Sequence, residues 1–97
     1  MMKLTVVTVD KERKGDVVEL FERAGVTGYS LIPSVLGSGQ TGKHLGSRAF
    51  PGDNAMLLAL VPAAQLETLQ RGLRALEQEL RPGQGLMAFK MDAEQLL

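Results

Sequence analysis

The stretch of residues 55–62, AMLLALVP, decides the fold. A nearly unbroken apolar run that ends at a proline is typical of a strand covered on both faces, in the middle of a sheet. Side chains alternate along a strand, so both faces of this one carry aliphatic residues that need burial. One face holds Met56, Leu58 and Leu60, and the other holds Ala55, Leu57, Ala59 and Val61.

The residues after this strand predict a helix and a final strand. Leucines recur in residues 63–80 at spacings of three and four, which indicates an amphipathic helix whose leucine stripe belongs to the core. These leucines are Leu66, Leu69, Leu73, Leu76 and Leu80. Residues 81–85, RPGQG, interrupt the helix, and residues 86–91, LMAFKM, predict the last strand.

The residues before the central run predict a strand, a helix and another strand. Residues 3–9, KLTVVTV, are rich in β-branched side chains, and apolar residues at helical spacing in 14–24 precede a stop signal at Gly25. Residues 27–36, TGYSLIPSVL, predict the second strand. Pro33 cannot donate a hydrogen bond to a neighbouring strand, so this strand is expected at a sheet edge or broken at the proline.

The predicted order is strand, helix, strand, strand, helix, strand. It fits a single domain over residues 1–97 with the ferredoxin-like βαββαβ sandwich of the α+β class, in which a four-stranded antiparallel sheet carries two helices on one face. The strands at 3–9 and 55–61 are apolar on both faces. Because the helices cover only one face, we expect the other to meet a partner subunit in a symmetric homo-oligomer.

Composition argues against several classes of protein. With 97 residues, the chain is near the size at which one core barely offsets chain entropy, which also favours an oligomer. Eleven basic and eleven acidic residues cancel, so nucleic acid is not expected as a partner. Cysteine is absent, which rules out disulfides and thiolate chemistry. Because no segment resembles a signal peptide or a bilayer-spanning helix, we expect a cytoplasmic protein without direct membrane insertion.

Residues 37–54 form a long stretch without helix or strand periodicity, and such a loop in a small domain is usually functional or mobile. It opens with GSGQTGKH at residues 37–44, which satisfies G-x-G-x-x-G and nearly satisfies the P-loop pattern. A P-loop needs a hydroxyl where His44 stands and a helix after it, and the glycines and proline that follow argue against a helix. Neither a P-loop nor a dinucleotide fold is predicted, but glycine-rich backbone that presents amides to an anion stays open.

On this scaffold the loop joins the second and third strands, and there the chain resembles the PII signalling proteins. The second strand and loop root of that family read roughly G-x-T-V-x-x-V-x-G-x-G-x-Q, and residues 28–40 read GYSLIPSVLGSGQ. Val61 and Pro62 are similar to the Val-Pro that opens the family's second helix. Residues 83–89, GQGLMAF, are similar to its Gly-Asp-Gly-Lys-Ile-Phe-type turn. The similarity extends over nearly the whole chain in order and spacing.

The resemblance implies a non-catalytic homotrimer that binds an adenine nucleotide, such as AMP, ADP, ATP or cyclic AMP, in the clefts between subunits. Ser30 matches the threonine that lies near the base. The loop root is matched by Gly37, Ser38, Gly39 and Gln40, and the phosphate turn by Gly83, Gln84 and Gly85. A target protein, either a transporter or an enzyme, would read the ligand state through the 37–54 loop.

Several positions depart from the family pattern. Leu86 stands where the family has its phosphate-binding lysine, and Gln84 replaces an acidic residue. Gly39 and Gln40 are adjacent, whereas the family pattern has one residue between the matching glycine and glutamine. The loop is shorter than in the family, and the C-terminal arginines that help to hold phosphates there are missing. A nucleotide such as AMP, ADP or a cyclic nucleotide is therefore favoured over magnesium-ATP.

The basic residues of the loop keep an alternative open. Lys43, His44 and Arg48 can neutralise a phosphate, bind a small anion such as bicarbonate, meet an acidic partner surface or simply be solvated. A metal at His44 would need carboxylates such as Asp53 or symmetry mates. The second hypothesis is therefore a trimeric accessory protein of a membrane transporter that binds a metal or small anion. The sequence contains no nucleophile–base pair that would suggest an enzyme. The acids at positions 10, 12 and 16 suit the start of a helix.

Overall fold

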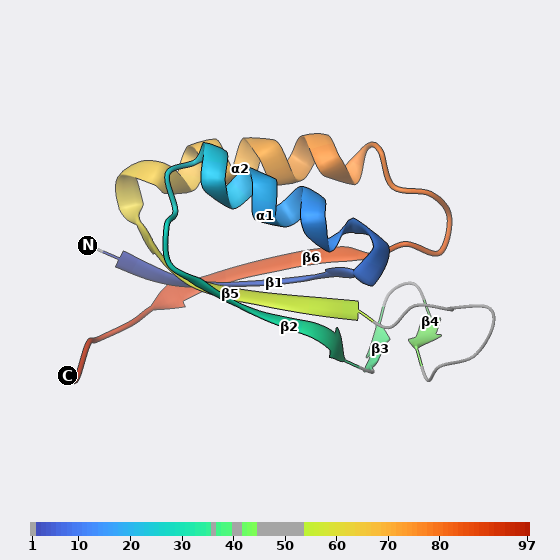
Figure 1. Cartoon of the computed structure of the whole chain (residues 1–97), viewed down its shortest axis with the longest axis horizontal. Helices are drawn as coiled ribbons and strands as arrows, with labels where there is room; N and C mark the ends of the chain where they lie inside the picture. Colours follow the sequence, from blue (N-terminus) through green and yellow to red (C-terminus); the bar gives the residue numbers. More distant parts are fainter. Residues whose placement is uncertain (1, 36, 40–41, 45–53) are drawn as a thin grey trace.

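The computed structural model describes residues 2–35, 37–39, 42–44 and 54–97. The elements in chain order are β1 (Met2–Asp10), the 3-10 turn η1 (Lys11–Arg13), α1 (Lys14–Arg23), β2 (Tyr29–Val35), β3 (Gly37–Gly39), β4 (Gly42–His44), β5 (Asn54–Pro62), α2 (Ala63–Glu77) and β6 (Leu86–Asp92). Four strands form one antiparallel sheet in the order β2-β5-β1-β6, and both helices cover the same face of it (Figure 1). The predicted ferredoxin-like βαββαβ sandwich is confirmed.

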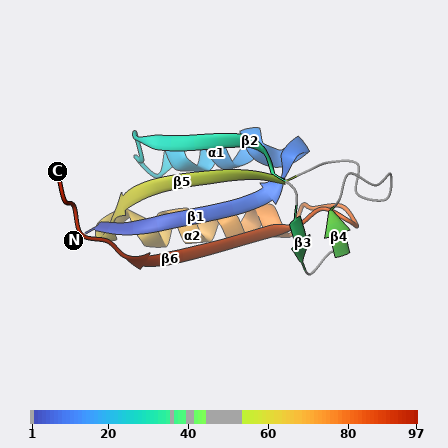
Figure 2. The same ribbon diagram turned by 90° about the horizontal axis from the view of Figure 1, so that it is seen from below.

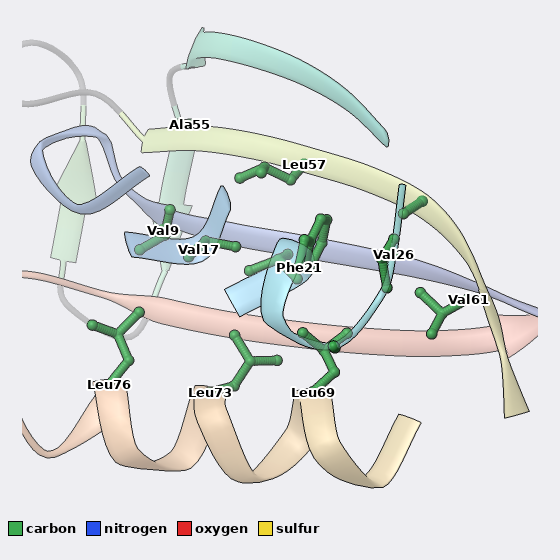
Figure 3. Close-up of a cluster of buried hydrophobic side chains, with 13 residues drawn as sticks. Val9, Val17, Phe21, Val26, Ala55, Leu57, Val61, Leu69, Leu73 and Leu76 are labelled. Carbon is green, nitrogen blue, oxygen red and sulfur yellow. The ribbon is translucent and has the colours of Figure 1, made fainter. Parts of the chain in front are cut away.

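The apolar run at 55–61 lies at the centre of the sheet, as predicted. Strand β5 pairs with β1 on one side and with β2 on the other. Its residues Ala55, Leu57 and Val61 point toward the helices and are fully buried. Figure 3 shows them facing leucines of α2, with Phe21 of α1 between the layers. The α2 leucines that the periodicity assigned to the core do lie in it, and Leu69, Leu73 and Leu76 are the buried ones.

Helix α1 ends where the sequence placed its stop signal. Gly25 has a φ of +80°, a conformation that side chains with a Cβ rarely adopt. Its amide donates to the carbonyl of Glu22, and the next amide, of Val26, donates to the carbonyl of Phe21. This pair of hydrogen bonds is the Schellman arrangement, and burial of both Val26 and Phe21 completes it. The turn sends the chain back across the sheet toward β2.

Helix α2 ends earlier than the leucine spacing predicted. Its last residue is Glu77 rather than Leu80, and the next amides bond to carbonyls three residues back. Such bonds tighten the final turn and satisfy carbonyl groups that the helix leaves free. Pro82 disfavours the helical conformation at the residue before it, so the helix has to stop near this point. Leu80 still packs against the core from the turn.

Strand β2 lies at the edge of the sheet, and its pairing with β5 is irregular at the proline. The register runs evenly from Tyr29 to Ile32 and then shifts before Val35. Pro33 falls inside the shifted segment, because it has no amide hydrogen to give to β5. Both features that the sequence predicted for this strand, an edge position and a local break, are therefore present.

The 37–54 segment contains regular structure that the sequence did not predict. Strands β3 and β4 pair as a short antiparallel hairpin, with Gly37 opposite His44 and Gly39 opposite Gly42. The hairpin lies beyond the end of the main sheet (Figures 1 and 2). The prediction of a loop throughout this segment was wrong for these residues, because glycines give no alternating pattern from which a strand can be recognised.

Figure 2 looks onto the face of the sheet that is turned away from the helices, and the side chains on this face are largely apolar. Cross-strand pairing places Phe89 beside Val6, Val6 beside Leu58 and Leu58 beside Ser30 on this face. Large apolar side chains are exposed there, Phe89 to 58%. The second apolar face that the sequence predicted is thus present, and its coverage by a partner subunit stays a prediction. In the described residues, no helix combines the length and apolar character needed to cross a membrane.

Candidate functional site

A hollow of about 610 Å³ lies at the sheet end where β1 begins and β5 ends. It is lined by apolar side chains of the central strands, including Leu4 and Leu60, and by polar groups at the start of β2. Ser30 is among the lining residues, opposite Leu58 in the sheet. Volumes of about 300 to 1,000 Å³ with mostly apolar walls and a few polar groups are usual for small-molecule sites.

Gln65, in the first turn of α2, also lines the hollow. Its Nε2 lies 3.4 Å from the carbonyl oxygen of Gly25, which it donates to. Its Oε1 is buried and accepts no hydrogen bond within the described part of the chain. The side-chain amide of Gln65 is therefore held in place through Nε2, and its Oε1 is left as an acceptor without a donor in the described part of the chain. This residue could not be singled out from the sequence, because a polar residue in the first turn of a helix is common.

Next to the hollow, Lys3 and Asp92 form an ion pair between the paired ends of β1 and β6. The hydrogen bond from Lys3 lowers the pKa of the Asp92 carboxyl, and the positive charge of Lys3 acts in the same direction. Asp92 therefore stays ionised to lower pH than an isolated aspartate. The pair ties the last strand to the first at this end of the sheet.

The turn between α2 and β6 lies at the opposite end of the sheet and holds the predicted phosphate-turn residues. Gly83 has a φ of +88° with open space around its Cα, so it supplies a bend that leaves the backbone accessible. The carbonyl of Gly85 accepts a hydrogen bond of 3.0 Å from the amide of Asp10, at the end of β1. The turn is thereby anchored to the sheet.

The side chain of Gln84 closes this turn. Its Oε1 accepts from the backbone amide of Arg81 at 2.9 Å, and its own backbone amide donates to the carbonyl of Arg81 at 3.0 Å. Its Nε2 and the guanidinium of Arg81 both donate to Oε1 of Glu12, at 3.3 and 3.0 Å. Gln84 therefore shapes the turn, and Arg81 and Glu12, which the sequence analysis did not assign to the site, adjoin it.

The predicted loop-root residues lie at the same end as this turn. Gly37, Ser38 and Gly39 form β3, just after the point where Val35 pairs with Asn54, and Asn54 in turn pairs with Asp10. Figures 1 and 2 both place the hairpin and the α2–β6 connection beyond this end of the sheet. Gln40 lies outside the described residues.

The basic residues of the loop are placed only in part. Lys43 and His44 belong to β4, in the hairpin, whereas Arg48 and Asp53 lie outside the described residues. No group of three or more His, Cys, Asp or Glu side chains is arranged to hold a metal ion within the described ranges.

Within one chain, the two groups of predicted site residues are far apart. Ser30 lies level with Val6 across the sheet, and Asp10, which contacts Gly85, is four residues further along β1. At about 3.3 Å per residue, the hollow and the turn are separated by about 13 Å along the strands. The structure therefore brings together the loop root and the turn, and it leaves Ser30 apart from them, in the hollow and about halfway along the sheet.

Comparison with known proteins agrees with this architecture. A family model described as nitrogen regulatory protein P-II matches residues 1–95. No curated protein matches the chain.

Solved structures with the same fold are similar over most of their length. The nitrogen regulatory PII-like protein CPII from Thiomonas intermedia, bound to ADP, AMP and bicarbonate, is 22% identical with a TM-score of 0.71, covering 93% of this chain and 85% of that one. A PII-like signalling protein from Thermus thermophilus is 24% identical with a TM-score of 0.58, covering 92% and 83%. A DUF3240 family protein from Shewanella baltica is 19% identical with a TM-score of 0.73, covering 98% and 92%.

Proposed function

This chain belongs to the nitrogen regulatory protein P-II family, and from that premise we propose that it is a regulatory protein whose homotrimer binds an adenine nucleotide between subunits. Ligand binding changes the state of the 37–54 segment, and a target protein reads that state. The observation that carries the proposal is the separation of the two predicted halves of the site, because Ser30 lies about 13 Å along the strands from the turn and on the opposite edge strand of the sheet.

A second copy of the chain removes this separation. When the apolar sheet faces of neighbouring subunits pack together, the hollow of one subunit is brought beside the turn of the next. Each ligand then contacts Ser30 of one subunit and the Gly83–Gly85 turn of the other. The exposed Phe89 and its neighbours supply the apolar area that such an interface needs.

The two halves suit the two ends of a nucleotide. Apolar walls from Leu4, Leu58 and Leu60 fit the faces of a planar base, while Ser30 and Gln65 offer polar groups to its edge. The turn at the other end offers open backbone at Gly83, where a phosphate can approach closely. The CPII relative is bound to ADP and AMP, which supports a ligand of this class.

A small anion is the second candidate ligand. CPII is bound to bicarbonate in one structure and to acetate in another, each together with adenine nucleotides. For this chain, the alternative is a trimeric accessory protein of a transporter, with Lys43, His44 and Arg48 of the loop as anion or metal ligands. Replacing Lys43 and His44 with alanine would then abolish anion binding and leave nucleotide affinity intact.

Calorimetric titration with AMP, ADP, ATP and cyclic AMP, with and without bicarbonate, tests the proposal. We expect heat of binding for at least one nucleotide, and the variant Ser30→Leu, which puts an apolar side chain into the hollow, should weaken it at least about tenfold. Thr68→Leu, on the exposed side of α2, is the matched control and should bind like the unchanged protein. Silent mixing with all four nucleotides at millimolar concentration, or a monomeric mass, would contradict the proposal.

A further inference from the structure

Arg81 is the first residue of the turn that follows α2, and its guanidinium forms an ion pair with Glu12. Its guanidinium donates from Nη2 to Oε1 of Glu12 at 3.0 Å. Glu12 comes from η1, 69 residues earlier in the chain, and its own amide is fixed by a 2.9 Å hydrogen bond to Oδ1 of Asp10. The carboxylate is therefore held beside the turn by the end of β1.

Gln84 connects the same carboxylate to the body of the turn. Its Nε2 donates to Oε1 of Glu12 at 3.3 Å, the oxygen that also accepts from Arg81. One carboxylate oxygen thus receives hydrogen bonds from both ends of the turn, and the open backbone at Gly83 lies between them. Leu86, which follows Gly85 at the end of the turn, has no charge to offer an anion.

We propose that Arg81 is the cation that binds a phosphate group of the nucleotide, and that Glu12 is a built-in competitor for it. A guanidinium binds carboxylate and phosphate through the same paired donors, so it exchanges one for the other. This inference rests on the proposed function, because it assigns roles inside the same nucleotide site.

The exposure of the pair makes this exchange feasible. The side chains of Arg81 and Glu12 are 71% and 58% exposed, and an ion pair that is so accessible to water is weak and is screened by salt. A phosphate group, which carries more negative charge than a carboxylate, can therefore replace the Glu12 carboxylate as the partner of the Arg81 guanidinium. Because the phosphate has to break this ion pair before it can bind Arg81, Glu12 sets an upper limit on affinity.

The test compares ADP with adenosine, which shares the base but has no phosphate, by calorimetry on the 97-residue chain. Arg81→Gln should weaken ADP binding about tenfold or more, as expected for loss of a charge-assisted hydrogen bond. Glu12→Gln should tighten ADP binding by about two- to fivefold. Adenosine affinity should stay within about twofold in both variants, because the base is bound at the other half of the site.

A double variant separates competition from simple repulsion. In the Arg81→Gln background, Glu12→Gln should no longer tighten ADP binding, because there is no guanidinium left to release. The matched control is Arg71→Gln, which removes an exposed arginine of α2 that pairs with Glu67, and it should leave ADP affinity unchanged. Circular dichroism checks that each variant folds.

The outcomes distinguish this inference from the proposed function. If the unchanged protein binds neither ADP nor adenosine, both are overturned. If it binds ADP and Arg81→Gln binds it equally well, only the role of Arg81 is overturned. If Glu12→Gln tightens ADP binding as much without Arg81 as with it, Glu12 is not a competitor for that side chain.

Discussion

At the scale of single residues, glycine backbone conformation decides where the chain turns. Gly25 has a φ of +80°, and a Cβ built there would lie 2.8 Å from Nε2 of Gln65. Any L side chain at this position therefore combines an unfavourable backbone conformation with a close contact. The same turn carries Gly28, Tyr29 and Ser30 to the hollow, so Gly25 positions the site as well as ending the helix.

We predict that Gly25→Ala destabilises the protein by about 1–2 kcal/mol or more, the usual cost of a left-handed conformation for a residue with a Cβ. Urea unfolding followed by circular dichroism, at one protein concentration, measures this change. Gly15→Ala is the matched control, because Gly15 lies in α1 with open space around it. That substitution should stabilise by up to about 1 kcal/mol. Equal stability of both variants would contradict the assignment of the Gly25 turn.

At the scale of elements, the start of α2 lacks the features that usually stabilise a helix N-terminus. The helix follows Pro62, no side chain caps its first amides, and its first turn contains no acidic residue. The first amides of a helix carry a partial positive charge that an acid can neutralise. This helix end lies beside the hollow, whose lining includes Pro62 and Gln65. The first turn of α2 therefore adds no negative charge beside the hollow.

We predict that Ala64→Glu stabilises the fold by about 0.3–1 kcal/mol, through its interaction with the helix dipole. Ala64 is exposed in the first turn of α2, so the longer side chain displaces nothing. Ala64→Gln has nearly the same shape without the charge and serves as the control. The difference between the two variants in urea unfolding should shrink as salt is added. A difference that is zero at low salt would show that the helix end is already compensated.

At the scale of the whole molecule, the two faces of the sheet have different roles. One face makes the core with the helices, and the other exposes Phe89 together with apolar side chains from all four strands. A single chain therefore leaves a broad apolar surface in water, which monomeric proteins rarely do. The proposed assembly through this face would cover it and join the hollow to the turn of a neighbouring subunit.

We predict that Phe89→Glu dissociates the oligomer, because it places a charge within an apolar interface. Phe89 lines neither the hollow nor the turn, yet nucleotide binding should disappear with the assembly. Multi-angle light scattering and calorimetry on the same samples measure both effects. Gln70→Glu adds the same charge on the exposed side of α2 and should leave mass and affinity unchanged. Full nucleotide affinity in a monomeric Phe89→Glu variant would contradict an intersubunit site.

Much of the fold could be predicted because its signals are local. The alternation in residues 55–61 identified both faces of β5, Gly25 marked the end of α1, and Pro33 placed β2 at an edge. Each signal depends on residues within one or two turns of the chain. The β3–β4 hairpin was missed, because its glycines give no periodic pattern, and α2 was predicted too long, because Leu80 continues the leucine spacing in a turn.

The candidate site was predicted less completely, because it is assembled from distant segments. Resemblance to a family predicted Ser30 and the Gly83–Gly85 turn as site residues, which stay predictions, and it did not single out Gln65, Arg81 or Glu12 as their neighbours. Contacts of this kind join residues tens of positions apart, and no local pattern encodes them.

The sequence by itself determined which elements form and which of their faces are apolar, because hydrophobic periodicity and backbone preferences act over a few residues. Only the tertiary structure decided that Ser30 and Gly85 lie on opposite edges of one sheet, and that Glu12 holds Arg81 at the turn. Both outcomes depend on how strands pair and layers pack, so they are fixed only when the whole chain has folded.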